Sequence, residues 1–216
     1  MKGRSGLFLL AEIVKKDLKV EFRSKASINQ MAIFALTATF LFSLSIDAKE
    51  FFPQIVLLII LFTSIAGSSA SILREFDFET IDGLKASPLR ASQTMAAKML
   101  SNLILVLILT TLIFPVFYAL FNLEGDFLLT LAALLISVVP ISGAIALLSP
   151  LAANSRGREM LLSAMLFPVI FPVLIPAVKS IELAHSGILD SMTILFIFSY
   201  TGIIWSLSML LSEHVL

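Results

Sequence analysis

Six long apolar runs follow one another along the chain, separated by short polar segments, and none of them contains Asp, Glu, Lys, Arg or His. Each run has roughly 18–23 residues, enough for a helix to cross a hydrocarbon core of about 30 Å at about 1.5 Å per residue. The pattern therefore predicts an all-α membrane protein with six transmembrane helices. The expected spans are 29–46, 53–73, 99–121, 127–149, 160–178 and 191–212.

The segment before the first span, residues 1–28, has its own apolar stripe with a three- or four-residue spacing. Basic side chains lie off this stripe, which is typical of an amphipathic helix on a membrane surface. A first helix packed on a soluble domain would show the same pattern, but the chain contains no soluble domain. We expect a surface helix at 1–28 and one membrane domain at 29–216. The stripe comprises Leu7, Leu10, Val14, Leu18 and Phe22, and the basic residues are Lys15, Lys16, Lys19 and Arg23.

Composition supports a membrane location, because only 14% of the 216 residues are charged and 58% are hydrophobic. About a quarter of the residues of a soluble domain are charged. The formal net charge of zero argues against a nucleic-acid partner. The chain has no cysteine, which excludes disulfides and thiolate chemistry.

Lys and Arg are distributed unevenly between the two sides of the expected topology. Thirteen lie in segments 1–28, 74–98 and 150–159, which fall on one side, whereas only Lys49 and Lys179 lie on the other. Because cytoplasmic loops carry the excess of basic residues, we expect both termini in the cytoplasm and the chain in the plasma (inner) membrane.

The spans lack the residues that an ion-driven carrier or an enzyme would need. A proton relay places ionisable groups inside the membrane, and no Asp, Glu, Lys, Arg or His side chain falls within a span. Phosphate-loop, zinc-protease and serine-hydrolase motifs are absent. His185 and His214 are expected on opposite sides of the membrane, so they cannot share a metal within one chain. The expectation is a non-enzymatic chain with no bound metal or cofactor, although His185, in an external loop, could be a ligand or simply solvated.

Prolines interrupt two of the expected spans. Pro168, Pro172 and Pro176 recur every four residues in the fifth, and Pro140 and Pro150 lie in or beside the fourth. Each proline removes one helical hydrogen bond, and the freed carbonyl needs a protein or water partner because lipid offers none. These positions are candidates for flexing during a transport cycle, or they are static kinks packed against neighbouring helices.

The longest polar loop, 74–98, begins acidic and ends basic, an order that suits a helix dipole. Phe78, Ile81 and Leu84 recur every three residues, Pro88 ends the segment, and a second helical stretch is expected from Ala91 into the third span. An apolar stripe among charges is a candidate docking site for a partner. A solvated loop with incidental apolar residues is the alternative.

The stretch "ETIDGLKASPLRASQTMAAKM" resembles the segment after the second span of exporter-type ABC permeases, where it forms the coupling helix that contacts the ATPase subunit. A glycine in the family pattern is Glu79 here. The resemblance implies that an ATPase docks on this segment. The implied docking residues are Glu79, Thr80, Ile81, Asp82, Leu84, Ser87 and Pro88, and Lys98 matches the lysine before the next span.

Over nearly its full length the chain resembles the CcmB family of haem-exporter permeases in cytochrome c maturation. The resemblance rests on "KKDLKVEFRSK", "VVPISGAIALLSP", "NSRGREMLLSAM" and "FPVIFPVLIPA", and on the short 179–190 segment. It implies a homodimer in a 2:2 complex with a CcmA-like ATPase that binds ATP, alongside CcmC-, CcmD- and CcmE-like proteins. Haem would be moved, or a haem-loaded chaperone would be released.

Three other functions remain compatible with the sequence. The chain could be a permease of the same class for a lipid, drug or polysaccharide. It could be an ATP-driven assembly factor that transports nothing. An intramembrane enzyme is disfavoured, because the spans offer no catalytic acid, base or metal ligand.

Overall fold

The computed structural model describes the backbone of residues 2–24, 26–45, 49–77, 91–153, 155 and 157–215, and the side chains of 8–23, 28–45, 49–67, 91–152, 155, 157 and 160–212. Throughout these ranges the regular structure is helical, with no strand, as the sequence predicts. The helices are α1 (Lys2–Ser24), α2 (Ala26–Ser43), α3 (Phe52–Asp77), α5 (Ala91–Leu120), α6 (Phe127–Ala153), α7 (Arg158–His185) and α8 (Ser191–Val215).

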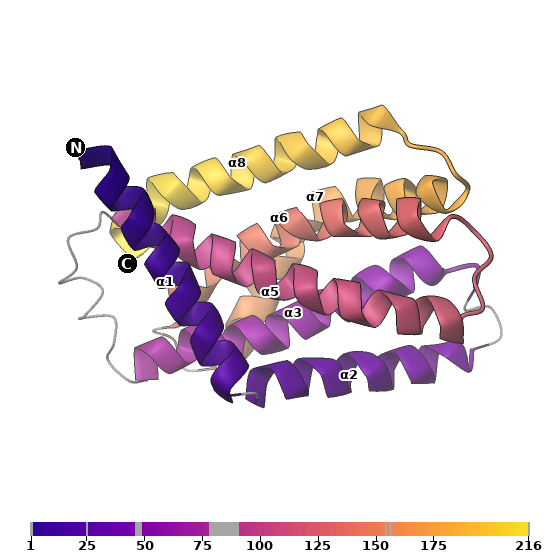
Figure 1. Ribbon diagram of the computed structural model, residues 1–216, viewed down its shortest axis with the longest axis horizontal. Coiled ribbons are helices and arrows are strands. Elements are labelled where there is room, and N and C mark those ends of the chain that lie inside the picture. The colour runs from indigo at the N-terminus through magenta and orange to yellow at the C-terminus, as the bar shows by residue number, and fades with distance from the viewer. Residues whose placement is uncertain are drawn as a thin grey trace.

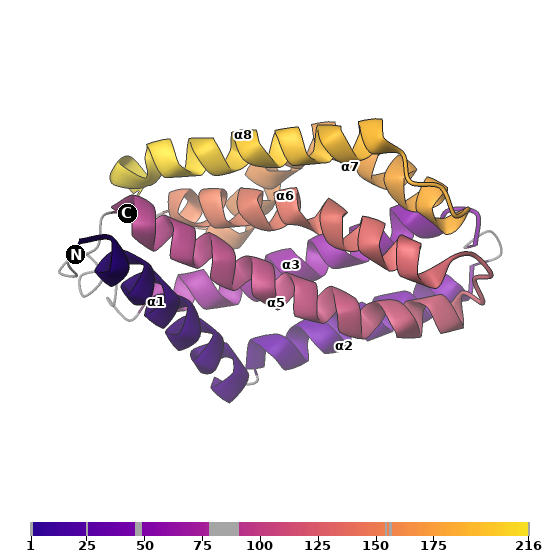
Figure 2. The same cartoon turned by 45° about the horizontal axis from the view of Figure 1, so that its top comes forward.

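The helices from α2 to α8 run alternately in opposite directions and form an elongated bundle (Figure 1). Helix α1 crosses one end of the bundle obliquely, beside both chain termini, as the second view also shows (Figure 2). The short turns at 121–126 and 186–190 lie at the opposite end. We call the two ends the α1 end and the turn end.

Helix α6 forms the centre of the bundle and contacts α3, α5, α7 and α8. Every residue from Pro140 to Pro150 is buried, because this stretch is rich in small side chains that let neighbouring helices approach closely. Gly143 lies against the indole of Trp205 on α8. A similar approach joins α2 and α3, where Met31 packs over Gly67.

Four helices are long and apolar enough to cross a membrane, namely α5, α6, α7 and α8. Helices α1 and α2 meet at 66° and would provide a fifth span if they counted as one bent element. The side chains of α3 are described only as far as Gly67, and the stretch Phe52–Gly67 is apolar. The all-helical membrane class is therefore confirmed, and six spans remain a prediction. Helix α5 begins at Ala91, where the sequence predicts the helix that leads into the third span.

Candidate coupling site

The expected docking segment lies between the end of α3 at Asp77 and the start of α5 at Ala91. Both flanking helix ends lie at the α1 end of the bundle (Figure 1). The docking residues themselves fall outside the described residues, so their role stays a prediction. They are Glu79, Thr80, Ile81, Asp82, Leu84, Ser87 and Pro88.

Two turns into α5, Lys98 makes an ion pair with α1. Its Nζ lies 3.4 Å from a carboxylate oxygen of Asp17, and only 11% and 10% of the two side chains are exposed. The same carboxylate lies 3.5 Å from the Ser101 hydroxyl and pairs with Lys16 at 3.3 Å. Because α5 is the first described helix after the docking segment, this contact links that helix to α1.

The covered face of α1 differs from a purely apolar stripe. Val14 is buried as expected, but Glu21 is buried too, and Phe22 of the expected stripe is exposed. The side that faces α5 therefore combines apolar and acidic residues. The sequence analysis missed Asp17 and Glu21, although their four-residue spacing, in helical register with Val14, was a readable signal. The placement of α1 on a membrane surface stays a prediction.

One turn deeper along α5, Asn102 forms a polar contact with α6. Its side-chain amide donates to the Ser142 carbonyl at 3.1 Å and lies 3.4 Å from the Ser142 hydroxyl. Asn102 is buried, and Ser142 lies two residues after Pro140. Polar contacts thus lead from α1 through α5 to the proline-containing centre of α6.

The structure separates the five candidate flexing prolines into two environments. Pro140 and Pro150 are buried in the bundle centre, whereas Pro168 and Pro172 are exposed and Pro176 is half-buried. Helices α6 and α7 run through all five without a break. Pro115, inside α5, is a further interruption that the sequence analysis did not single out.

The described bundle interior holds neutral polar groups rather than charges. Most of its buried hydroxyls donate to the carbonyl one helical turn earlier, as in Thr39, Thr63, Thr110, Ser137 and Ser208. Glu21, on α1, is the one carboxylate among the described residues that is fully covered. No group of three His, Asp or Glu side chains that could hold a metal occurs within the ranges described.

His185 was expected in an external loop, but it is the last residue of α7 and is half-buried at the turn end. Its ring lies 4.6 Å from the ring of Phe52, and its Nδ1 lies 3.5 Å from the Thr130 hydroxyl. Its carbonyl accepts the Asp126 N–H at 3.0 Å. The ring packs against Phe52 of α3 and Thr130 of α6, so the expected loop placement was wrong, whereas a ligand role for His185 stays a prediction.

Comparison with known proteins identifies the family. A family model described as CcmB protein matches residues 8–211, nearly the whole chain. The chain belongs to the CcmB family. This membership, with the apolar helices, makes the chain a membrane permease of the cytochrome c maturation ABC transporter. Among curated proteins, the sequence search finds no match.

Proposed function

We propose that this CcmB-family chain is the passive membrane subunit of a transporter whose energy comes from a separate cytoplasmic ATPase. The ATPase docks on the segment around Ile81 and Leu84. The observation that carries the proposal is the Asp17–Lys98 ion pair, because it joins α1 to the helix that begins where the docking segment ends. A push on this segment would reach α1 through Lys98 and α6 through Asn102.

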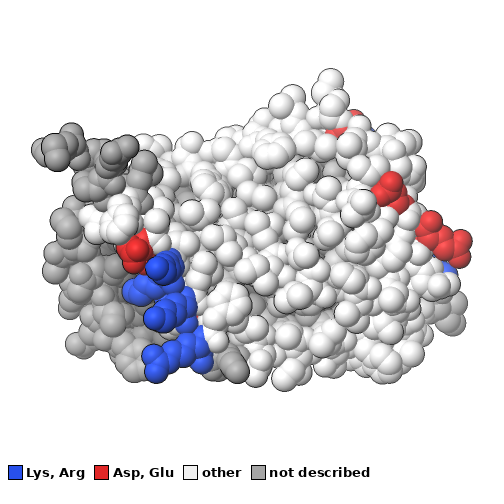
Figure 3. Space-filling view, in the orientation of Figure 1, with Lys and Arg blue, Asp and Glu red and all other residues white. Residues whose placement is uncertain are grey.

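The proposed orientation of the chain in the membrane rests on the distribution of its charged side chains. Basic side chains gather at the α1 end, whereas acidic side chains mark the turn end on the face shown (Figure 3). This distribution supports cytoplasmic termini in an inner-membrane protein. With cytoplasmic termini, the proposed docking segment would lie on the side of the membrane where ATP is available.

A docking test compares Ile81→Asp and Leu84→Asp with the conservative control Ile81→Leu. We expect both Asp variants to lose co-purification of the ATPase, because a charge replaces an apolar contact. The control should retain it, and all three should keep the wild-type melting temperature in detergent. Retained ATPase binding and haem delivery in both Asp variants would contradict the docking role.

The task that we propose for the complex is haem export or release of a haem-loaded chaperone. Reconstituted vesicles separate the two, because only export accumulates haem on the far side. ATP turnover with chaperone release and no accumulated haem supports the release function. Accumulation of a lipid or drug in place of haem would redirect the proposal to another substrate of the same permease class.

The membrane half of the complex needs a second component. We propose two copies of the chain in a 2:2 complex with the ATPase, alongside CcmC-, CcmD- and CcmE-like membrane proteins.

A further inference from the structure

The outer side of α1 carries a row of basic side chains. Lys15, Lys19 and Arg23 recur every four residues, and all three are exposed. Residues four apart lie on one side of a helix, about 6 Å apart along its axis. Val14 and Glu21 of the same helix are buried, so the contacts of α1 with the bundle and its basic side chains lie on different sides. We call Lys15, Lys19 and Arg23 the basic row.

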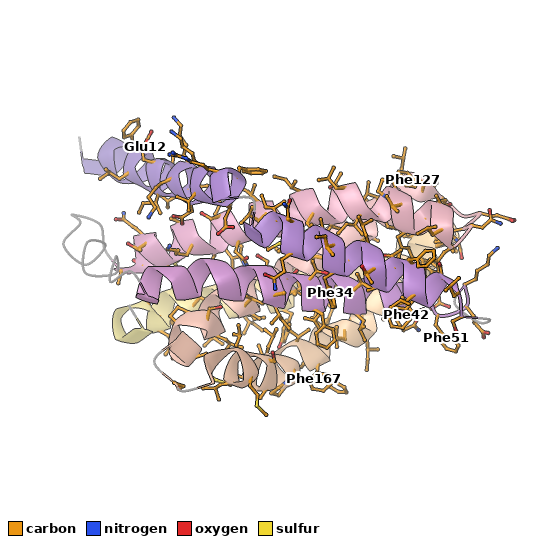
Figure 4. All side chains as sticks on the ribbon, turned by 90° about the horizontal axis from the view of Figure 1, so that it is seen from below. Glu12, Phe34, Phe42, Phe51, Phe127 and Phe167 are labelled. Carbon is orange, nitrogen blue, oxygen red and sulfur yellow. The ribbon has the colours of Figure 1, made fainter. Side chains whose placement is uncertain are left out.

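The basic row has no acidic partner in the part of the chain that the structure describes. The Asp17 carboxylate pairs with Lys16 and Lys98, and no ion pair with the basic row occurs among the described side chains. Glu12 is the only exposed acid within residues 8–23, and Figure 4 shows it on the side of α1 that is turned away from the bundle. One acid does not balance the bases, so the outer side of α1 has a net positive charge.

The basic side chains of α1 lie where charged surface meets uncharged surface. Figure 3 shows Lys and Arg in a row along the edge of a wide surface without charge. A membrane protein presents such a surface to the hydrocarbon core, and the headgroups lie at the border of that core with water. Helices α1 and α2 meet at 66°. If α2 crosses the membrane as the sequence predicts, α1 is closer to the membrane plane than to its normal, and the basic row lies at the depth of the lipid phosphates.

Two exposed phenylalanines lie on the same flank of α1 as Lys15. Phe8, Lys15 and Phe22 are seven residues apart, which is close to two helical turns, and the two rings are 65% and 47% exposed. Contact with water is unfavourable for apolar rings. A helix at a membrane surface instead buries such rings at the boundary between headgroups and acyl chains, while its lysines extend to the phosphates. This flank therefore fits a lipid surface better than the surface of a soluble ATPase.

We propose that the basic row binds the phosphate groups of anionic phospholipids in the cytoplasmic leaflet, with Phe8 and Phe22 inserted between the headgroups. A zwitterionic lipid also has a phosphate, but the positive charge beside that phosphate repels the row. A lipid with net negative charge is therefore favoured, and each basic side chain near an anionic surface strengthens binding about fivefold. This inference rests on the proposed function only for the cytoplasmic location of α1.

The lipid contact acts on the side of α1 opposite its ion pair with α5. Asp17 and Lys19 are two residues apart, so their side chains point to opposite sides of the helix. Asp17 holds α1 to Lys98 of α5, and the lipid phosphates hold the basic row. Helix α1 is thus fixed between α5 and the membrane surface, so the charge of the lipid helps to set the position of α1.

A lipid-retention experiment on the full complex tests the inference. The complex is extracted from nanodiscs with equal amounts of phosphatidylglycerol and phosphatidylcholine, and mass spectrometry gives the ratio of the two lipids that stay bound after detergent exchange. Lys15→Gln/Lys19→Gln is compared with the matched control Lys49→Gln/Lys179→Gln, which removes two exposed lysines at the turn end. We expect the preference for phosphatidylglycerol to fall at least about fivefold in the α1 variant, and the control should keep it.

Three further measurements separate the effect of charge from an effect on folding. Lys15→Arg/Lys19→Arg keeps both charges and should keep the preference for phosphatidylglycerol. In nanodiscs of phosphatidylcholine alone, Lys15→Gln/Lys19→Gln should melt at the wild-type temperature, because both side chains are exposed. Raised salt should weaken the preference of the wild-type complex, because salt screens exposed charges.

Three results would overturn the inference. One is an unchanged lipid preference in Lys15→Gln/Lys19→Gln, and another is an equal fall in the two Gln variants. The third is loss of the ATPase from the α1 variant with its lipid preference intact, which would show that the basic row docks the ATPase. If the wild-type complex contains no ATPase but still prefers phosphatidylglycerol, the proposed function fails and the lipid contact stands.

Discussion

Asp17 on α1 and Lys98 on α5 form an ion pair of 3.4 Å in which both side chains are about nine-tenths covered. The pair joins α1 to the second turn of α5, the helix that follows the expected docking segment. Partial burial makes it stronger than a solvent-exposed pair, because water screens it less. It also makes the loss of one partner harmful, because the remaining charge stays covered.

We expect Lys98→Ala to lower the free energy of unfolding by about 2 kcal/mol, the scale of a hydrogen bond to a charged group. ATPase activity should also become uncoupled from haem delivery, because α1 no longer moves with α5. Melting temperature in detergent and the ratio of ATP hydrolysed to haem delivered are the two measurements.

Lys16→Ala is the matched control, because Lys16 pairs with the same carboxylate but its side chain is 51% exposed. Its loss should change stability by less than about 1 kcal/mol. The exchange Asp17→Lys/Lys98→Asp should recover at least half of the coupling that Lys98→Ala loses. Normal coupling in Lys98→Ala, or no recovery of the lost coupling in the exchange variant, would contradict the mechanical role of the pair.

Gly143 on α6 permits the contact with Trp205 on α8. A Cβ at this position would lie 2.8 Å from Nε1 and 3.0 Å from Cδ1 of the rigid indole. We therefore expect Gly143→Ala to destabilise the bundle by about 1–3 kcal/mol through overpacking. Trp205 is the only tryptophan, so its fluorescence reports the displacement directly.

The control is Gly202→Ala on α8, where a Cβ would meet nothing within 4 Å. Alanine is favoured over glycine in a helix by about 1 kcal/mol, so this variant should be as stable as wild type or slightly more stable. Equal melting temperatures for the two variants would show that α6 and α8 do not approach as closely as the structure indicates.

Tyr200→Phe tests how the α7 carbonyls are satisfied inside the bundle. The variant removes the hydrogen bond to the Val169 carbonyl. The free energy of unfolding should fall by about 1 kcal/mol, the usual net contribution of one hydrogen bond. Ser199→Ala also deletes a hydroxyl of α8, but that hydroxyl donates to the Leu195 carbonyl within the same helix. Faster amide exchange in α7 is expected for Tyr200→Phe alone, and similar exchange in both variants would argue against an interhelical role.

Asp190 provides a test at the turn end. Hydrogen bonds from the Thr193 hydroxyl and the Met192 N–H, with the charge of Lys179, hold the pKa of this carboxyl below its usual range. Because the folded pKa is depressed, the stabilisation is present above the unfolded pKa of about 4 and is lost as pH falls through the folded value.

Asp190→Ala should therefore melt below wild type at pH 7, and the difference should shrink below about pH 4. Asp190→Asn keeps a capping side chain, so its melting temperature at pH 7 should lie between those of wild type and Asp190→Ala. A difference in melting temperature that does not change with pH would rule out the charged carboxylate as the cause.

The sequence predicted the helical membrane class because apolar runs of membrane-spanning length form a strong local signal, and it located the start of α5 at Ala91. Family membership was also readable, through short motifs and their order along the chain. The sequence misjudged His185, because its environment depends on Phe52 and Thr130, which are distant in the chain.

Local pattern therefore determined which segments are helical and apolar, whereas the tertiary structure decided what each segment touches. The acidic side of α1 is an example. In the sequence, Asp17 does not differ from the other charged residues of the expected surface helix, and only the tertiary structure places Lys98 of α5 beside it. The prolines of α6 and α7 look alike in sequence, yet packing buries Pro140 and Pro150 and leaves Pro168 and Pro172 exposed. The physical reason is that burial and hydrogen-bond partners come from neighbouring helices, and no periodicity along a single chain specifies which neighbours those are.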